Sequence, residues 1–171
     1  MGVELMGEVR NCRDIGRNLQ KIVSRLMAND KLISLLFFTD KDPLSHEPLS
    51  DGEKKDLIFE KLIKVVPRID AEKKEKATSL VSIRVVRGRQ NSENTEFKDM
   101  IIEVETFVPL TQWMIKDSNL RPFAIMGEIQ ESLNGKTIDG LGRMVGGDFD
   151  LNFITEEIAG YVQMFYITSY E

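Results

Sequence analysis

The side chains that most often carry catalysis are scarce in this sequence. His46 is the one histidine among 171 residues, and it lies between Ser45 and Glu47 with no nucleophile motif beside it. We interpret it as an ordinary surface histidine. Cys12 is the one cysteine, and we interpret it as a small helix residue, the alternative being a reactive thiol. The sequence therefore predicts a protein that is not an enzyme.

Two pairs of carboxylates have a spacing that suits a hard cation. Asp148 and Asp150 are two residues apart, so in a strand both would project from one side, where calcium or magnesium could bind. Only two such ligands are evident, and the alternative is a solvated strand face. Asp40 and Asp42, beside Pro43, could likewise bind a cation. We expect them instead to hold their loop through side-chain to backbone hydrogen bonds. We predict neither a metal site nor a cofactor site.

The segment 140–147 is rich in glycine and could suggest a phosphate-binding loop. The dinucleotide fingerprint, however, needs a third glycine where Val145 stands, and it needs a helix afterwards. The residues that follow alternate as in a strand. We therefore predict turn or bulge glycines here. The glycines concerned are Gly140, Gly142, Gly146 and Gly147.

The last part of the chain, 144–171, contains no lysine or arginine and five acidic residues. Such an excess can arise by chance or serve solubility, but it also suits a surface that faces a passing polyanion such as DNA, because like charges repel across a narrow channel. The acidic residues are Asp148, Asp150, Glu156, Glu157 and Glu171.

Composition narrows the class of protein. The net charge of -5 and the pI of about 5.1 exclude the basic footprint of a dedicated nucleic-acid binder. One cysteine permits no intramolecular disulfide. There is no long apolar run and no signal-peptide core at the N-terminus, so we expect a soluble protein made in the cytoplasm, without membrane contact. Length and hydrophobic content predict a single domain over 1–171.

Helical periodicity dominates the first third of the chain. A helix is predicted from Ile15 to Met27, followed by a short second helix capped by Asp30 and an irregular loop over 40–48. Ser50 and Glu53 have the spacing of a capping box, which predicts a third helix that ends near Pro67.

Alternation with a period of two takes over later. Strands are predicted over 79–87, around 101–108, over 148–153 and from 159 to 170, with the first two forming a hairpin joined by the long polar loop 88–96. Between them, Pro122 fits the first turn of a helix that Asn134 and Gly135 would stop.

The order of these elements resembles the tail-terminator proteins of long-tailed bacteriophages, which lie where the tail tube joins the neck. The likeness is spread over most of the chain and contains no catalytic signature. The residues that carry it are Leu26-Met27-Ala28-Asn29, Leu35 to Leu44, Val66-Pro67, Ile101-Ile102-Glu103-Val104 with Val108, Asn119-Leu120-Arg121-Pro122, Leu133 to Lys136, Gly140-Leu141-Gly142, Gly160-Tyr161 and Phe165-Tyr166.

The resemblance implies a fold and a role. Such terminators are α+β, with helices packed on one side of a mostly antiparallel sheet. They form hexameric rings that stop tube growth and offer an interface for head-tail joining. We therefore expect a virion protein of the neck, made in the host cytoplasm, whose partners are copies of itself, the tail tube protein and head completion or connector proteins. DNA would be a partner only as the passing genome.

A ring of identical subunits requires two different, complementary contact surfaces on each subunit. We expect Gly88 to Glu96 to reach the neighbouring subunit, with Arg87, Arg89, Gln90 and Asn91 in the contact, and we expect Tyr161 and Tyr166 to contribute aromatic surface. The alternative is an ordinary exposed hairpin and an ordinary core strand. Asp148, Asp150, Glu156 and Glu157 would line the DNA channel.

Two rival functions remain open. Another head-tail connector or head completion protein would share the self-assembly but lie on the head side of the neck. A small metal- or ligand-binding regulatory α+β domain would belong to a different class, and it would use Asp148 and Asp150 as ligands.

Overall fold

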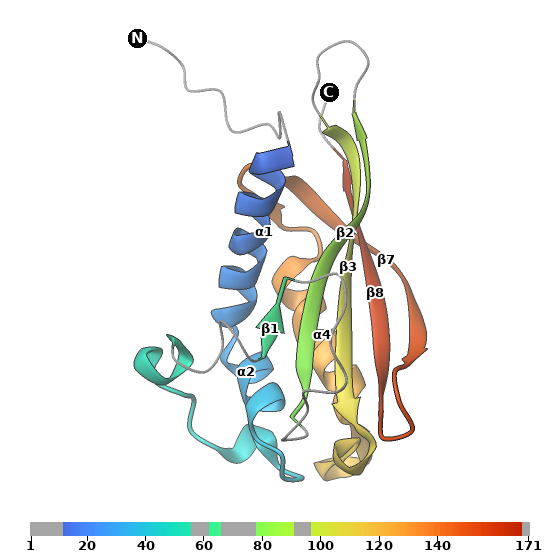
Figure 1. Ribbon diagram of the computed structural model, residues 1–171. Helices are drawn as coiled ribbons and strands as arrows, with labels where there is room; N and C mark the ends of the chain where they lie inside the picture. Colours follow the sequence, from blue (N-terminus) through green and yellow to red (C-terminus); the bar gives the residue numbers. More distant parts are fainter. Residues whose placement is uncertain (1–11, 56–61, 66–77, 91–96, 169–171) are drawn as a thin grey trace.

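The computed structural model describes residues 12–55, 62–65, 78–90 and 97–168, and its fold is α+β (Figure 1). A curled sheet of six strands, in the order β1-β2-β3-β8-β7-β6, has helices packed against one face, as expected. Only β1 and β2 are parallel. The helices are α1 (Cys12–Met27), α2 (Asp30–Phe37) and α4 (Arg121–Leu133). The strands of this sheet are β1 (Ile63–Lys64), β2 (Leu80–Gln90), β3 (Phe97–Pro109), β6 (Thr137–Ile138), β7 (Gly142–Phe153) and β8 (Ile158–Thr168).

Short elements fill the connections. The 3₁₀ turns are η1 (Pro43–Ser45), η3 (Leu110–Gln112) and η4 (Lys116–Ser118), and β4 (Met114–Ile115) pairs with β5 (Asn119–Leu120) in a small second sheet. The described helices are not long and apolar enough to cross a membrane.

Helices α1 and α2 follow the predicted apolar pattern, with one correction at the cap. Ile22 and Leu26 of α1 are fully buried beneath the sheet. The N-cap of α2 is Asn29, whose Oδ1 accepts a hydrogen bond from the Leu32 amide at 3.0 Å, so the expectation that Asp30 is the cap was wrong. Asparagine is an equally good cap, and here its Nδ2 also donates to the Glu128 carboxylate of α4 at 3.0 Å.

The third predicted helix begins as expected but does not reach Pro67. Ser50 and Glu53 form the capping box, with the Glu53 Oε2 accepting from the Ser50 hydroxyl at 2.6 Å, and residues 51–55 are helical. Residues 56–61 and 66–77 lie outside the described residues. Ile63 and Lys64, expected in this helix, form strand β1 instead, because the Leu62 carbonyl accepts from the Val81 amide at 2.7 Å and Ile63 is buried in the core.

The predicted hairpin is strands β2 and β3, and it is longer than expected. Gly88 pairs with Met100 and Arg89 with Asp99, so the residues expected to begin a loop continue the ladder to Gln90. Residues 91–96, including the expected contact residue Asn91, lie outside the described residues. A bulge between Val85 and Arg87 shifts the register.

The glycine-rich segment is partly turn and partly strand. Gly140 and Gly142 have φ values of 79° and 106°, as a turn requires, but from Gly142 onward the chain is strand β7. A bulge follows Gly146, as predicted. Gly147 lies beneath the Tyr166 ring, where a Cβ would be 2.2 Å from Cε2.

A buried arginine joins the helical layer to the loops below it. The Arg121 side chain, fully buried at the start of α4, donates to the carbonyls of Gln112 at 2.9 Å, Leu35 at 2.8 Å, Phe38 at 2.7 Å and Asp40. Burial lowers the pKa of this guanidinium, and the negative charge of Asp40 opposes that effect. Four backbone groups from three segments therefore depend on one side chain.

We predict that Arg121→Leu lowers the free energy of unfolding by about 3–5 kcal/mol, because the four carbonyls lose their donor in a buried place. Arg121→Lys should lose less, since it keeps the charge but not the planar fork. Urea unfolding measures both. The exposed Arg143→Leu is the control and should change stability by about 0.5 kcal/mol or less; equal losses in the three variants would contradict this role.

A second prediction compares two glycines. At Gly160 a Cβ would lie 1.7 Å from the Thr106 carbonyl oxygen, whereas at Gly127, exposed on α4, nothing lies within 4 Å. Gly160→Ala should therefore cost about 2–4 kcal/mol, and Gly127→Ala should stabilise the helix by about 0.5–1 kcal/mol. Thermal unfolding of the two variants checks both signs.

Candidate functional site

The sheet face opposite the helices, here called the outer face, carries a charged network. Arg84 of β2 donates from Nε to Glu103 Oε2 at 2.7 Å and from Nη1 to Glu105 Oε2 at 3.1 Å. Asn152 of β7 donates from Nδ2 to Glu105 Oε1, and its own partner in β8 is Gly160, which has no side chain to stand between them. The network therefore links β2, β3 and β7 across β8.

Glu105 is the buried carboxylate of this network. The residue is only 4% exposed. Burial raises the pKa of its carboxyl group, the positive charge of Arg84 lowers it, and the negative charge of Glu103 raises it further. Each carboxylate oxygen already accepts a hydrogen bond, so this side chain serves to join strands.

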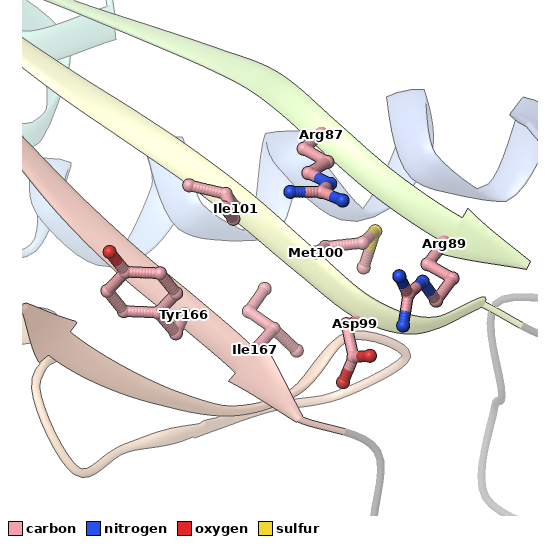
Figure 2. Close-up of a pocket in the computed structure, with 7 residues that line it drawn as sticks. All are labelled: Arg87, Arg89, Asp99, Met100, Ile101, Tyr166 and Ile167. Carbon is pink, nitrogen blue, oxygen red and sulfur yellow. The ribbon is translucent and has the colours of Figure 1, made fainter.

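A hollow of about 270 Å³ lies further along the outer face (Figure 2). Arg87 and Arg89 of β2, Asp99 and Ile101 of β3 and Tyr166 of β8 line it. The ladders explain the grouping, because Arg87 pairs with Ile101, which in turn pairs with Tyr166. Both guanidinium groups have no ion pair within the described part of the chain, so this surface can accept carboxylates from outside.

The residues expected at an interface are thus divided between two faces. Arg87, Arg89 and Tyr166 come together on the outer face, and Gln90 ends the same strand. Tyr161 lies on the helix side, because it pairs with the core residue Thr106 and its ring contacts Phe123 of α4.

An aromatic group on the helix side was not recognised from the sequence. We call it the Tyr161 cluster: the Tyr161 ring centroid lies 4.8 Å from that of Phe123, 6.0 Å from Phe149 and 6.3 Å from Trp113. Strand β7 extends this apolar surface, since Leu151 is 47% and Phe153 74% exposed. The alternation of Phe149, Leu151 and Phe153 did indicate an apolar strand face, but not that the helices leave it uncovered.

The four acidic residues expected to line the DNA channel are exposed. Asp148 is part of the β7 bulge and Asp150 pairs with Val162, on the outer face with Glu105. Glu156 and Glu157 lie in the turn between β7 and β8. The described residues contain no group of three or more histidine, cysteine, aspartate or glutamate side chains placed to hold a metal ion.

The loop after α2 is held by the Asp40 side chain, as predicted, whereas Asp42 departs from the prediction because its Oδ2 accepts from the Lys116 ammonium at 2.9 Å. Asp40 Oδ1 accepts from the Asp42 amide at 2.8 Å, and this bond, together with the interaction with His46, lowers the pKa of Asp40. His46 is exposed but not isolated: its Nε2 lies 2.7 Å from Asp40 Oδ2, and its ring stacks on Phe38 with centroids 3.9 Å apart. Cys12 is exposed at the start of α1.

The two terminal strands of the sheet, β1 and β6, are short, and in the described structure each pairs with only part of its neighbouring strand. Strand β1 pairs with β2 only at Val81 and Ser82, and among the described residues 85–90 have no partner strand on that side; we call 85–90 the basic edge. Strand β6 and Asn134 cover β7 as far as Gly146, which leaves 147–153 open in the described structure; we call this the acidic edge. These two edges bound the outer face (Figure 1).

A known protein family matches the part of the chain that carries these surfaces. The family model YomW matches residues 29–167. The chain belongs to the YomW family. The matched region runs from the cap of α2 almost to the end of β8, so it contains both edges, the Tyr161 cluster and the Arg84 network. Neither the curated proteins nor the solved structures include a match.

We predict a pH-dependent role for Glu105. Because its pKa is raised in the folded state, the folded protein binds the proton more tightly than the unfolded chain does, and stability gained from this group grows as pH falls from neutral toward its ordinary value of 4.5. Relative to Glu105→Gln, the wild-type protein should therefore gain stability over that range. Urea unfolding at several pH values measures the difference, with the exposed Glu131→Gln as control; a difference independent of pH would contradict the prediction.

Proposed function

We propose that this YomW-family protein is a structural component of a bacteriophage neck, of the tail-terminator type. It caps the tail tube as a hexameric ring and forms the interface for head-tail joining. One observation carries the proposal. The same sheet has the basic edge on β2, toward one side, and the acidic edge on β7, toward the other. Two unlike patches on one subunit are what head-to-tail ring closure needs.

The exposed apolar side chains support a role in assembly. Phe149 of the Tyr161 cluster lies in a row with Leu151 and Phe153 on one strand, and each is about half exposed or more. A contiguous apolar surface of this kind, flanked by charged residues, is typical of protein contact sites. The resemblance to terminators supplies the partners: copies of the chain, the tail tube protein and head completion proteins.

The acidic turn suits the passage of DNA. Glu156 and Glu157 are exposed at the tip between β7 and β8, where no lysine or arginine is near in sequence. In a ring with this tip toward the channel, like charges would keep the genome from adhering to the wall. The protein would thus meet DNA without binding a sequence, in a virion neck assembled in the host cytoplasm.

We expect electron microscopy of the protein mixed with purified tail tubes to show a ring at one end of each tube, absent from tubes alone. The tube end supplies a template on which the uncovered edges can close. Density at the head vertex of whole particles, with none on tubes, would favour the rival head-side connector. Absence of the protein from tubes, heads and particles would contradict a neck function.

A further inference from the structure

The basic and acidic edges have compatible strand directions. Each neighbouring pair in the order β2-β3-β8-β7 is antiparallel, so β2 and β7 run in opposite directions. A second copy beside the first, with its outer face on the same side, therefore sets its β2 antiparallel to β7 of the first. The ladder can then continue from one subunit to the next without turning either over.

The short outer strands determine how the two copies must be offset. Within one sheet, Arg87 is level with Val145, through Ile101 and Tyr166. At that level β6 and Asn134 already occupy the edge of β7. The uncovered segments, 85–90 and 147–153, meet along their length only if the second copy slides about five residues, or roughly 16 Å, along the strand. A stagger of this kind is a normal part of closing a sheet into a ring, where strands tilt to the axis.

This offset brings complementary charged side chains together on the outer face. When Arg87 stands opposite Asp150, Arg89 stands opposite Asp148, and all four are exposed in the single subunit. The same offset sets Val86, 46% exposed and part of the β2 bulge, level with Leu151, 47% exposed. Charged residues of opposite sign thus face each other in one register, which a slip of one residue would abolish.

We propose that copies of this chain associate head to tail by antiparallel pairing of the basic edge of one with the acidic edge of the next, Arg87 facing Asp150 and Arg89 facing Asp148. The inference rests on the self-assembly in the proposed function and names its contact. Backbone hydrogen bonds supply affinity, and the ion pairs select the register and the partner. Asp148 and Asp150 then belong to the subunit contact, which leaves Glu156 and Glu157 for the DNA passage.

Two charge-reversed variants test the contact. In Arg87→Glu/Arg89→Glu both edges are acidic, and in Asp148→Lys/Asp150→Lys both are basic. Each variant alone should fail to associate, with the dissociation constant raised at least about 10-fold in analytical ultracentrifugation, because like charges oppose each other. An equimolar mixture should regain association, since every contact between unlike variants again joins opposite charges.

Controls separate this contact from general charge effects. Lys31→Glu/Lys41→Glu and Glu47→Lys/Glu131→Lys change exposed residues away from the edges by the same total charge and should associate like the wild type. Circular dichroism confirms that each variant is folded. Failure of the mixture to recover, or a wild-type chain that stays monomeric up to about 1 mM, overturns the proposal. Recovery without binding to tail tubes would support the contact while contradicting the neck function.

Discussion

The arrangement of the helical layer depends on one buried cation. Arg121 gathers carbonyls from the end of α2, from the loop that follows it and from η3, and so sets where α4 begins. Its own amide donates to the Trp113 carbonyl at 2.7 Å, which fixes the short turn before the helix. A guanidinium in such a place needs several acceptors to offset the loss of water, and only a converging set of chain segments provides them. The position of Trp113 and Phe123 beside Tyr161 follows from this arrangement.

Close backbone approach shapes the other half of the molecule. Gly160 allows β8 to lie against the Thr106 carbonyl, and Gly147 allows the Tyr166 ring to cover β7 at its bulge. The bulge turns the strand at the point where β6 and Asn134 stop covering it, so the uncovered edge begins there. The same residues that bend the sheet thus expose Asp148 and the strand beyond it.

Regular patterns were readable in the sequence, and irregular ones were not. The amphipathic faces of α1 and α4, the alternation in β3 and the aromatic and β-branched composition of β8 extend far enough to identify each element. Strand β1 has two residues, which have no period of their own, and Ile63 matched the helix pattern instead. Burial of Arg121 and exposure of Phe153 depend on contacts remote in sequence, so neither follows from residue type. Tyr161 and Tyr166 are five residues apart, so alternation alone puts them on opposite faces of β8, and strand pairing decides that Tyr166 is the one on the outer face.

Uncovered strand edges favour aggregation, because their free backbone groups can pair with the strands of other chains. In this chain the charges restrict that tendency. Two acidic edges brought together would set Asp148 and Asp150 against their own copies, and two basic edges would do the same with Arg87 and Arg89, so symmetric pairing of like edges is disfavoured. Strands β1 and β6 also block pairing without an offset, because they already occupy part of the edges of β2 and β7. Among the described residues, charge and coverage together favour pairing between unlike edges with an offset, which is a head-to-tail contact and not a two-fold one.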